Sequence, residues 1–385
     1  MITANSVLAD EHELTPPKFP RKICAWKNQN FIVRKFFMNP FFDSLSSDQK
    51  KLIWEQVGRV RDTFNSPNCF SPSGDCDGTI ISAHTIQRKA LSIISRDGHV
   101  YDLRPDLGQL FKNGEDFRPE LKGIKQVSTF NGFCEKHDCE LFKPIETEAY
   151  TASGKQHFSL FFRALAKEMH DKIQGIKSFP ALEELQKIHP NSPIEVYRHF
   201  DEFRLQAMVA AIKMLEFKSW LNSIYMADEF RRIQSYVATF KRTPSILCAG
   251  FANLLYDFNG MPCQNLFNAQ KFYPAVSISV FPTNPGGAVV FSWPDIASKE
   301  PIQFCKSFDA IPSNRKTSAI IRMLFEYCGN IALSPEWWES LDDVTRNVLT
   351  RRFYNGLRSG PRSDDCLMDD GLNLDDWQVS HACFV

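Results

Sequence analysis

Apolar residues recur at helical spacing in long stretches of the chain. The clearest is SLSSDQKKLIWEQVGRVRDTF, residues 44–64, which predicts an amphipathic helix with Ser47 or Asp48 as its N-terminal cap. Its apolar face comprises Leu52, Ile53, Val57 and Val60. Residues 148–240 are also mostly helical in pattern. Within them, the run 192–240 is too long for one ordinary globular helix and predicts either two helices or one long spine.

Alternating apolar residues predict strands in two regions. Residues 273–293 contain the runs YPAVSISVFP and AVVFSW around an NPGG turn, which predicts a β-hairpin. Nearer the N-terminus, TIISAHTI predicts a strand leading into the helix QRKALSIIS, and GHVYDL predicts another strand. The Gly- and Pro-punctuated stretch from Arg104 to Gly123 predicts a loop, and a helix is expected from Cys134 to Phe142, ended by Pro144.

The pattern changes after Glu146, from short mixed elements to long helical runs. We therefore expect an α+β protein with a mixed domain over residues 21–150 and a mostly helical domain over 151–360, on which the hairpin packs. Residues 1–20 are polar, end in PPKFP and predict a mobile arm. Six Asp residues after Gly360 predict a loose acidic tail over 361–385.

Composition narrows the class of protein. Basic and acidic residues balance at 45 each, which argues against a histone-like binder, and the 33 Phe predict a real core. The 11 Cys are too scattered for a disulfide scaffold. The sequence has no apolar run typical of a signal peptide and no apolar stretch of about 18 residues that could cross a membrane. We expect a soluble cytoplasmic protein with reduced thiols.

A basic segment near the N-terminus offers two interpretations. Between Lys18 and Lys35 there are six basic residues and no acidic residue, with aromatic side chains interleaved. Basic groups contact phosphates and aromatic rings stack on bases, so the segment is a candidate for nucleic-acid binding. The alternative is a solvated strand edge with its apolar residues turned inward.

Thiols and imidazoles gather around one stretch, STFNGFCEKHDCELFKPIE. Cys134 and His137 have a spacing that can close on one metal ion, and Cys69 and Cys76 lie upstream in the turn-rich loop 65–78. These four residues suit a structural zinc site. His84 is then a spare imidazole with a separate chemical role.

The arrangement of a Cys-bearing loop, a strand ending in His and a helix with Cys-x-x-His is similar to a treble clef and resembles the HNH (ββα-metal) endonuclease family. The resemblance covers residues 65–146. It implies that His84 activates a water and that Asp138 takes the helix position where the family often has Asn or His. Glu135 and Glu146 are candidates for binding a catalytic Mg²⁺ or Mn²⁺. The first Cys pair is more widely spaced than the family's Cys-x-x-Cys, and the gap between His84 and Cys134 is longer.

Two function classes remain open. The first is an HNH-like nuclease that hydrolyses nucleic acid. SAHTIQ and GHVY look like stretches of bacterial proteins encoded near phage-defence or mobile-element genes, which implies a defence role. The second is a non-enzymatic module, in which zinc staples the loop region and the helices bind a protein or nucleic acid. In that case His84 is a core or capping residue, and Asp138 is a first-turn acid that favours the helix dipole.

Overall fold

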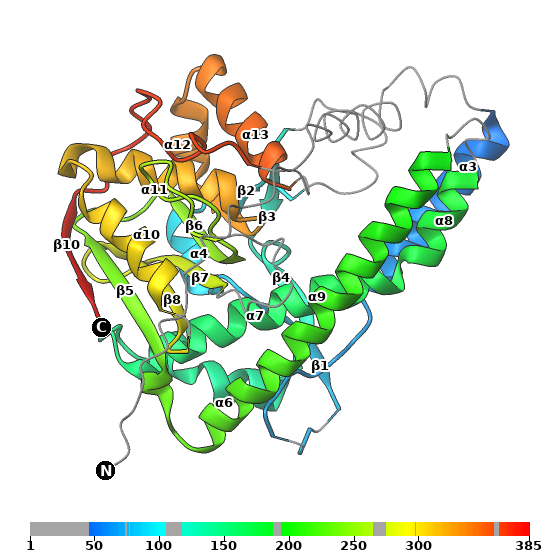
Figure 1. Cartoon of the computed structure of the whole chain (residues 1–385), viewed down its shortest axis with the longest axis horizontal. Helices are drawn as coiled ribbons and strands as arrows, with labels where there is room; N and C mark the ends of the chain where they lie inside the picture. Colours follow the sequence, from blue (N-terminus) through cyan, green and yellow to red (C-terminus); the bar gives the residue numbers. More distant parts are fainter. Residues whose placement is uncertain are drawn as a thin grey trace, which may run out of the picture.

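The molecule is organised around one antiparallel sheet with helices on both faces (Figure 1). The computed structural model describes residues 46–385, except Gly74, Asp77, Ala297 and the ranges 105–117, 188–193, 265–274 and 358–361. The arm expected over residues 1–20 and the basic segment 18–35 lie outside the described residues. In coarse terms the fold is mixed α and β, as expected.

The sheet has eight strands in the order β10-β5-β8-β7-β6-β9-β2-β3, and every neighbouring pair is antiparallel. The strands are β2 (His99–Asp102), β3 (Glu120–Gly123), β5 (Ile233–Phe240), β6 (Ile246–Ala252), β7 (Val276–Pro282), β8 (Gly287–Pro294), β9 (Ile331–Leu333) and β10 (Val379–Phe384). A separate two-stranded sheet pairs β1 (Ile80–His84) with β4 (Thr129–Cys134). The hairpin expected at residues 273–293 is confirmed as β7 and β8.

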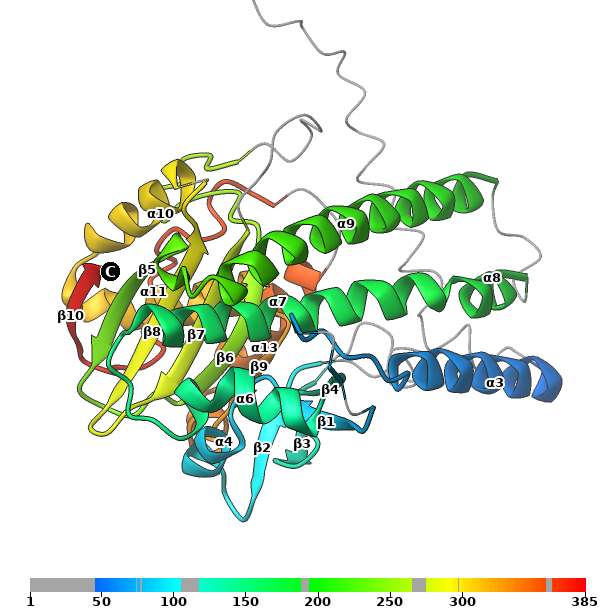
Figure 2. The same ribbon diagram turned by 90° about the horizontal axis from the view of Figure 1, so that it is seen from below.

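Both faces of the large sheet are apolar. On β6, Ile246 and Cys248 point into the main core, whereas Leu247 and Ala249 point to the opposite face. The main core is covered by α10 (Lys299–Asp309), α11 (Ser313–Tyr327), α12 (Pro335–Ser340) and α13 (Asp343–Leu357). The other face is covered by α4 (Arg88–Ile94) and by α7 (Gly154–Lys177), which runs across the strands in Figure 2. This burial on two sides explains why β8 is buried at every position.

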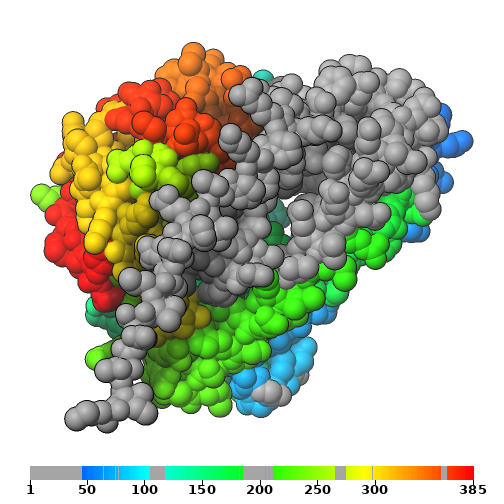
Figure 3. Space-filling view, in the orientation of Figure 1, coloured from blue at the N-terminus to red at the C-terminus, as the bar shows by residue number. Residues whose placement is uncertain are grey.

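Long helices extend beyond the sheet. They are α3 (Ser47–Phe64), the second half of α7, α8 (Phe179–Lys187) and α9 (Ile194–Met226). In the space-filling view, the bright green surface of α9 forms a ridge that runs toward the blue end of α3 (Figure 3). The amphipathic helix expected at 44–64 is confirmed as α3. Its cap is Ser46 rather than Ser47 or Asp48, because Ser46 Oγ accepts from the Gln49 amide and the Gln49 side chain accepts from the Ser46 amide.

Several sequence expectations require correction. The run 192–240 is one helix, α9, followed by strand β5, so its last eight residues are not helical. The stretch 104–123 contains strand β3. Helix α6 (Glu135–Glu146) continues past Pro144, which lies inside its last turn. The expected domain boundary at residue 150 is crossed by the large sheet, since β2 and β3 pair with each other and β2 pairs with β9.

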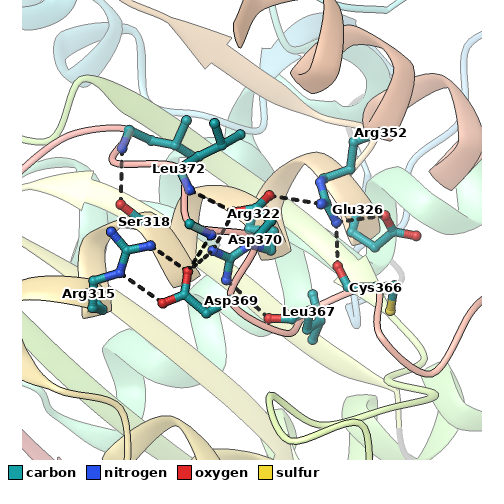
Figure 4. A network of polar contacts seen from close by, with 12 residues as sticks. Arg315, Ser318, Arg322, Glu326, Arg352, Cys366, Leu367, Asp369, Asp370 and Leu372 are labelled. Carbon is teal, nitrogen blue, oxygen red and sulfur yellow. Dashed lines mark hydrogen bonds and ion pairs between the residues drawn. The ribbon is translucent and has the colours of Figure 1, made fainter.

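The C-terminal segment is not a loose tail. It passes the arginines of α11 and α13 (Figure 4) and ends as the edge strand β10 (Figure 1). The Arg322 guanidinium, with 3% of its side chain exposed, donates to Leu367 O at 3.1 Å and to Asp370 Oδ1 at 2.8 Å. Asp369 also pairs with Arg315, and Trp377 is buried against Phe240 with ring centroids 5.1 Å apart. Asp369 and Asp370 therefore have basic partners on helices that are distant in sequence.

We expect Arg322→Met to destabilise the fold by about 2 kcal/mol, because it removes the hydrogen bonds of a buried guanidinium to Leu367 O and Asp370 Oδ1, while Asp369 and Asp370 keep their pairs with Arg315 and Arg352. Urea unfolding followed by far-UV circular dichroism measures this. The matched control is Arg346→Met, which removes an exposed pair with Asp343 on α13 and should change stability by less than about 0.5 kcal/mol. Equal midpoints for the two variants would show that the Arg322 network does not hold the C-terminal segment.

Candidate metal centre

The loop after α3 is held beside β4 by backbone hydrogen bonds. The Asn68 amide donates to Asn131 O at 3.1 Å, and the Phe70 amide donates to Gly132 O at 2.9 Å. Gly132 leaves room for the ring of Phe130 on the same strand, because a Cβ at position 132 would overlap that ring. The two hydrogen bonds bring Cys69 next to the end of β4, where Cys134 is the N-terminal cap of α6.

The four predicted ligands converge in space. The ligand atoms of Cys69, Cys76, Cys134 and His137 all lie within 4.8 Å of one another. His137 Nδ1 lies 3.4 Å from Cys69 Sγ and 3.1 Å from Cys134 Sγ. In a tetrahedral zinc site, sulfur and nitrogen ligands would be separated by about 3.6 Å, given Zn–S and Zn–N bonds of about 2.3 and 2.1 Å. The group could therefore hold a metal ion with small adjustments.

The second ring nitrogen of His137 faces away from the thiols. His137 Nε2 lies 2.8 Å from Ser73 Oγ and 3.1 Å from Asp75 Oδ1. A proton on Nε2 can be donated to these oxygens, which leaves the Nδ1 lone pair directed at the cluster. The pKa of the Asp75 carboxyl is lowered, chiefly by its bond from the Lys136 ammonium and then by Ser73 and His137. Asp75 is thus an anionic acceptor beside the ligand.

His84 ends strand β1, where it pairs with Thr129 of β4, and its side chain is half-buried. Its Nε2 lies 2.9 Å from Ile124 O. Because a carbonyl oxygen only accepts, Nε2 must carry the proton, and Nδ1 of the neutral ring then keeps its lone pair. Among the described residues, Nδ1 has no hydrogen-bond partner. The imidazole is therefore fixed at one nitrogen and able to accept a proton at the other.

Ser128 holds the end of β1 in place. It is fully buried and adopts a left-handed conformation with φ of 59°. Its carbonyl accepts from the Thr85 amide at 2.7 Å, and its hydroxyl accepts from the Ile86 amide at 2.9 Å. A non-glycine residue in this region is strained, and these two bonds offset the strain. The chain immediately after His84 is therefore anchored to the residues that precede β4.

Asp138, one residue after His137, lies near His84 and near two further charged residues. Burial raises the pKa of its carboxyl, while the charges of Arg163 and His84 oppose that rise and the charge of Glu146 adds to it. Asp138 Oδ1 is buried without a hydrogen-bond partner. Arg163 of α7 is buried, donates to Glu146 Oε1 at 2.5 Å and lies 4.0 Å from the centroid of the Phe142 ring. The structure thus gathers three of the four predicted site residues other than the metal ligands.

Other residues of the site depart from the sequence-based expectations or were missed by them. Glu135, the remaining candidate carboxylate, is solvent-exposed at the start of α6. Ser73 and Asp75 were missed, although their position between Cys69 and Cys76 marks them as neighbours of any metal bound there. Arg163 was also missed, and its proximity to Asp138 arises only from the packing of α7 on α6.

Comparisons with known proteins give no family. No protein-family model matches the chain, and no similar curated protein or solved structure was found. None of the helices in the described part of the chain is long and apolar enough to cross a bilayer. The function is therefore argued from the geometry of the site.

We expect Asp75→Ala to weaken metal binding about tenfold to a hundredfold, because loss of a carboxylate that orients a ligand histidine typically has that effect. Competition with a chromophoric chelator measures the affinity. Glu140→Ala is the matched control, since Glu140 is an exposed acid on α6, the helix that bears His137. Identical affinities for the two variants would contradict the orienting role of Asp75.

Proposed function

We propose that the protein is a metal-dependent nuclease of HNH-like type, which hydrolyses phosphodiester bonds of nucleic acid. The observation that carries the proposal is the state of His84. Its ring is anchored through Nε2 at the end of a strand, its Nδ1 is unpartnered among the described residues, and Asp138 lies close enough to influence it electrostatically. Cleavage of foreign nucleic acid in phage or mobile-element defence is the setting implied by the likeness of SAHTIQ and GHVY to stretches of bacterial proteins, some of them encoded near such genes.

We assign zinc to the cluster of Cys69, Cys76, Cys134 and His137. Three thiolates and one imidazole are a donor set that zinc prefers, and four protein ligands leave no open position for substrate. The zinc would therefore be structural. The loop that bears Cys69 and Cys76 contributes few large apolar side chains, so metal binding stabilises its contact with α6.

The proposed chemistry is assigned to residues beside the zinc. His84 Nδ1 would take a proton from the attacking water, whose oxygen forms a bond to phosphorus as the bond to the leaving oxygen breaks. Asp138, with Glu146 nearby, would hold a Mg²⁺ or Mn²⁺ ion. Such an ion, when bound, supplies neutralisation of charge on the phosphoryl oxygens. Arg163 would keep Glu146 oriented toward this site through its hydrogen bond.

The alternative is a non-enzymatic module in which zinc staples the loop to α6. The burial of Asp138 favours this alternative, because a carboxyl whose pKa is raised by burial is a weaker cation ligand. The module would bind nucleic acid or protein without cleaving it.

We expect purified protein to contain one zinc per chain, measured by inductively coupled plasma mass spectrometry on material never exposed to chelator. Cys134→Ser should lose the zinc and lower the melting temperature, because the ligand is buried at the cap of α6. Cys139→Ser is the control, since Cys139 is exposed on the same helix and is outside the cluster. Zinc-free wild-type protein would contradict the assignment.

We expect His84→Ala to retain zinc and the wild-type melting temperature but to lose cleavage of plasmid DNA or RNA in Mg²⁺ or Mn²⁺ by about a hundredfold or more, as loss of a general base typically does. His99→Ala is the matched control, because His99 is an exposed histidine at the start of β2. If wild-type protein cleaves no nucleic acid with any divalent ion, or if His84→Ala unfolds as Cys134→Ser does, the stapled module becomes the better account.

A further inference from the structure

The segment between β1 and β4 is an insertion with its own anchor on the large sheet. It contains α4, β2 and β3. Ala90, Leu91 and Ile94 of α4 are buried in one apolar cluster with Leu247 and Ala249 of β6. Because one side of α4 is fixed against the sheet in this way, its other side is presented outward with little freedom to rotate.

The outward side of α4 is basic, and it lies close to His84 along the chain. Arg88 and Lys89 are exposed, and they follow His84 by only four and five residues. Five residues of chain span at most about 17 Å. Lys125, also exposed, is adjacent to Ile124, whose carbonyl oxygen accepts from the His84 ring at 2.9 Å. Ile124 also packs against the apolar cluster that contains Ala90 and Leu91 of α4, so the two ends of the insertion lie together and carry three cations near His84.

These three cations have no ion-pair partner among the described residues. The neighbouring Lys122, in contrast, is paired with Asp102 at 3.2 Å and with Glu120 at 3.4 Å. Helix α6 exposes Glu135 and Glu140 together with the basic Lys143, so its own surface is mixed in charge. The unpaired positive charge near His84 therefore lies on the insertion, where a polyanion is attracted.

We propose that this basic surface, formed by Arg88, Lys89 and Lys125, binds the phosphate backbone of the nucleic acid beside the bond to be cleaved. The inference rests on the proposed function for its choice of ligand. Guanidinium groups bind phosphate through two parallel hydrogen bonds, and ammonium groups act as point charges, so the surface reads backbone rather than sequence. Such a surface serves duplex and single strands alike.

The test is a binding measurement that does not need catalysis. Fluorescence anisotropy of labelled 20-base-pair DNA and 20-nucleotide RNA is recorded for full-length protein at several salt concentrations, without added divalent ions. The test variant carries Arg88→Gln, Lys89→Gln and Lys125→Gln. The control carries Lys241→Gln, Lys299→Gln and Lys306→Gln, exposed cations that lie away from the insertion, two of them on α10 over the opposite face of the sheet.

For the test variant we expect at least about tenfold weaker binding at 100 mM salt and a DNA salt slope smaller by about 2 to 3, since each lost phosphate contact removes about 0.9. The control should keep the wild-type slope, and both variants should keep zinc and melting temperature. Wild-type affinity and slope in the test variant would overturn the proposal. The proposal would also be overturned if the test variant lost binding to anionic lipid vesicles as much as it lost binding to nucleic acid. It would be overturned as well if the wild-type protein bound no nucleic acid.

This inference and the nuclease proposal fail in different ways. If wild-type protein binds but cleaves nothing, and the test variant loses binding, the basic surface stands and hydrolysis does not. If wild-type protein cleaves and the test variant binds and cleaves equally well, hydrolysis stands and the basic surface is wrong.

Discussion

The sheet is apolar on both faces, and the rest of the molecule is arranged by the need to cover them. Strand β8 is buried along its whole length, which no sheet with one solvated face permits. The helices α10, α11 and α13 satisfy one face, and α4 and α7 satisfy the other. The small β1–β4 sheet and α6 are tied to these two helices, because β4 and α6 pack against α7 and α4 follows β1 in the chain. The candidate metal centre is therefore positioned by the same burial that stabilises the sheet.

The sequence predicted elements whose signals are local. Helix α3 and the β7–β8 hairpin carry their period and their turn residues within a single stretch, and Cys134 and His137 lie on one helical turn. The failures are nonlocal. Only a turn and a short 3-10 helix (Phe230–Arg232) separate α9 from β5, so the alternating residues of β5 resemble a continuation of the helix. Strand β3 pairs with β2, and β2 joins the sheet by pairing with β9. Nothing in the residues of β2 and β3 indicates β9 as the partner.

The acidic C-terminus shows the same limit. Asp369 and Asp370 resemble a solvated tail when only their neighbours in sequence are considered. Their partners are Arg315 and Arg322 on α11 and Arg352 on α13 (Figure 4). The buried Trp377 fixes the segment that follows. Likewise, the four metal ligands follow from spacing, but the effect of Arg163 on Asp138 requires α7 to lie across α6. Charge patterns along a chain give the sign of a surface, whereas packing decides which charges are paired.

The difference between the two proposed functions reduces to what His84 and Asp138 leave unsatisfied. An unpartnered nitrogen alone does not distinguish a reacting histidine, because the buried His170 also has a nitrogen, Nε2, without a hydrogen-bond partner among the described residues. His84 differs from His170 in its access to solvent. His84 is bonded at Nε2 alone, and its ring is half-buried, so Nδ1 is available to a water. The two properties of Asp138 oppose each other, because a bound cation would relieve its buried and unpartnered Oδ1, whereas the raised pKa of the same carboxyl weakens it as a ligand. A zinc staple does not require an accessible Nδ1 on His84. That nitrogen, with the unpaired cations of the insertion nearby, favours a reacting phosphate as the missing partner.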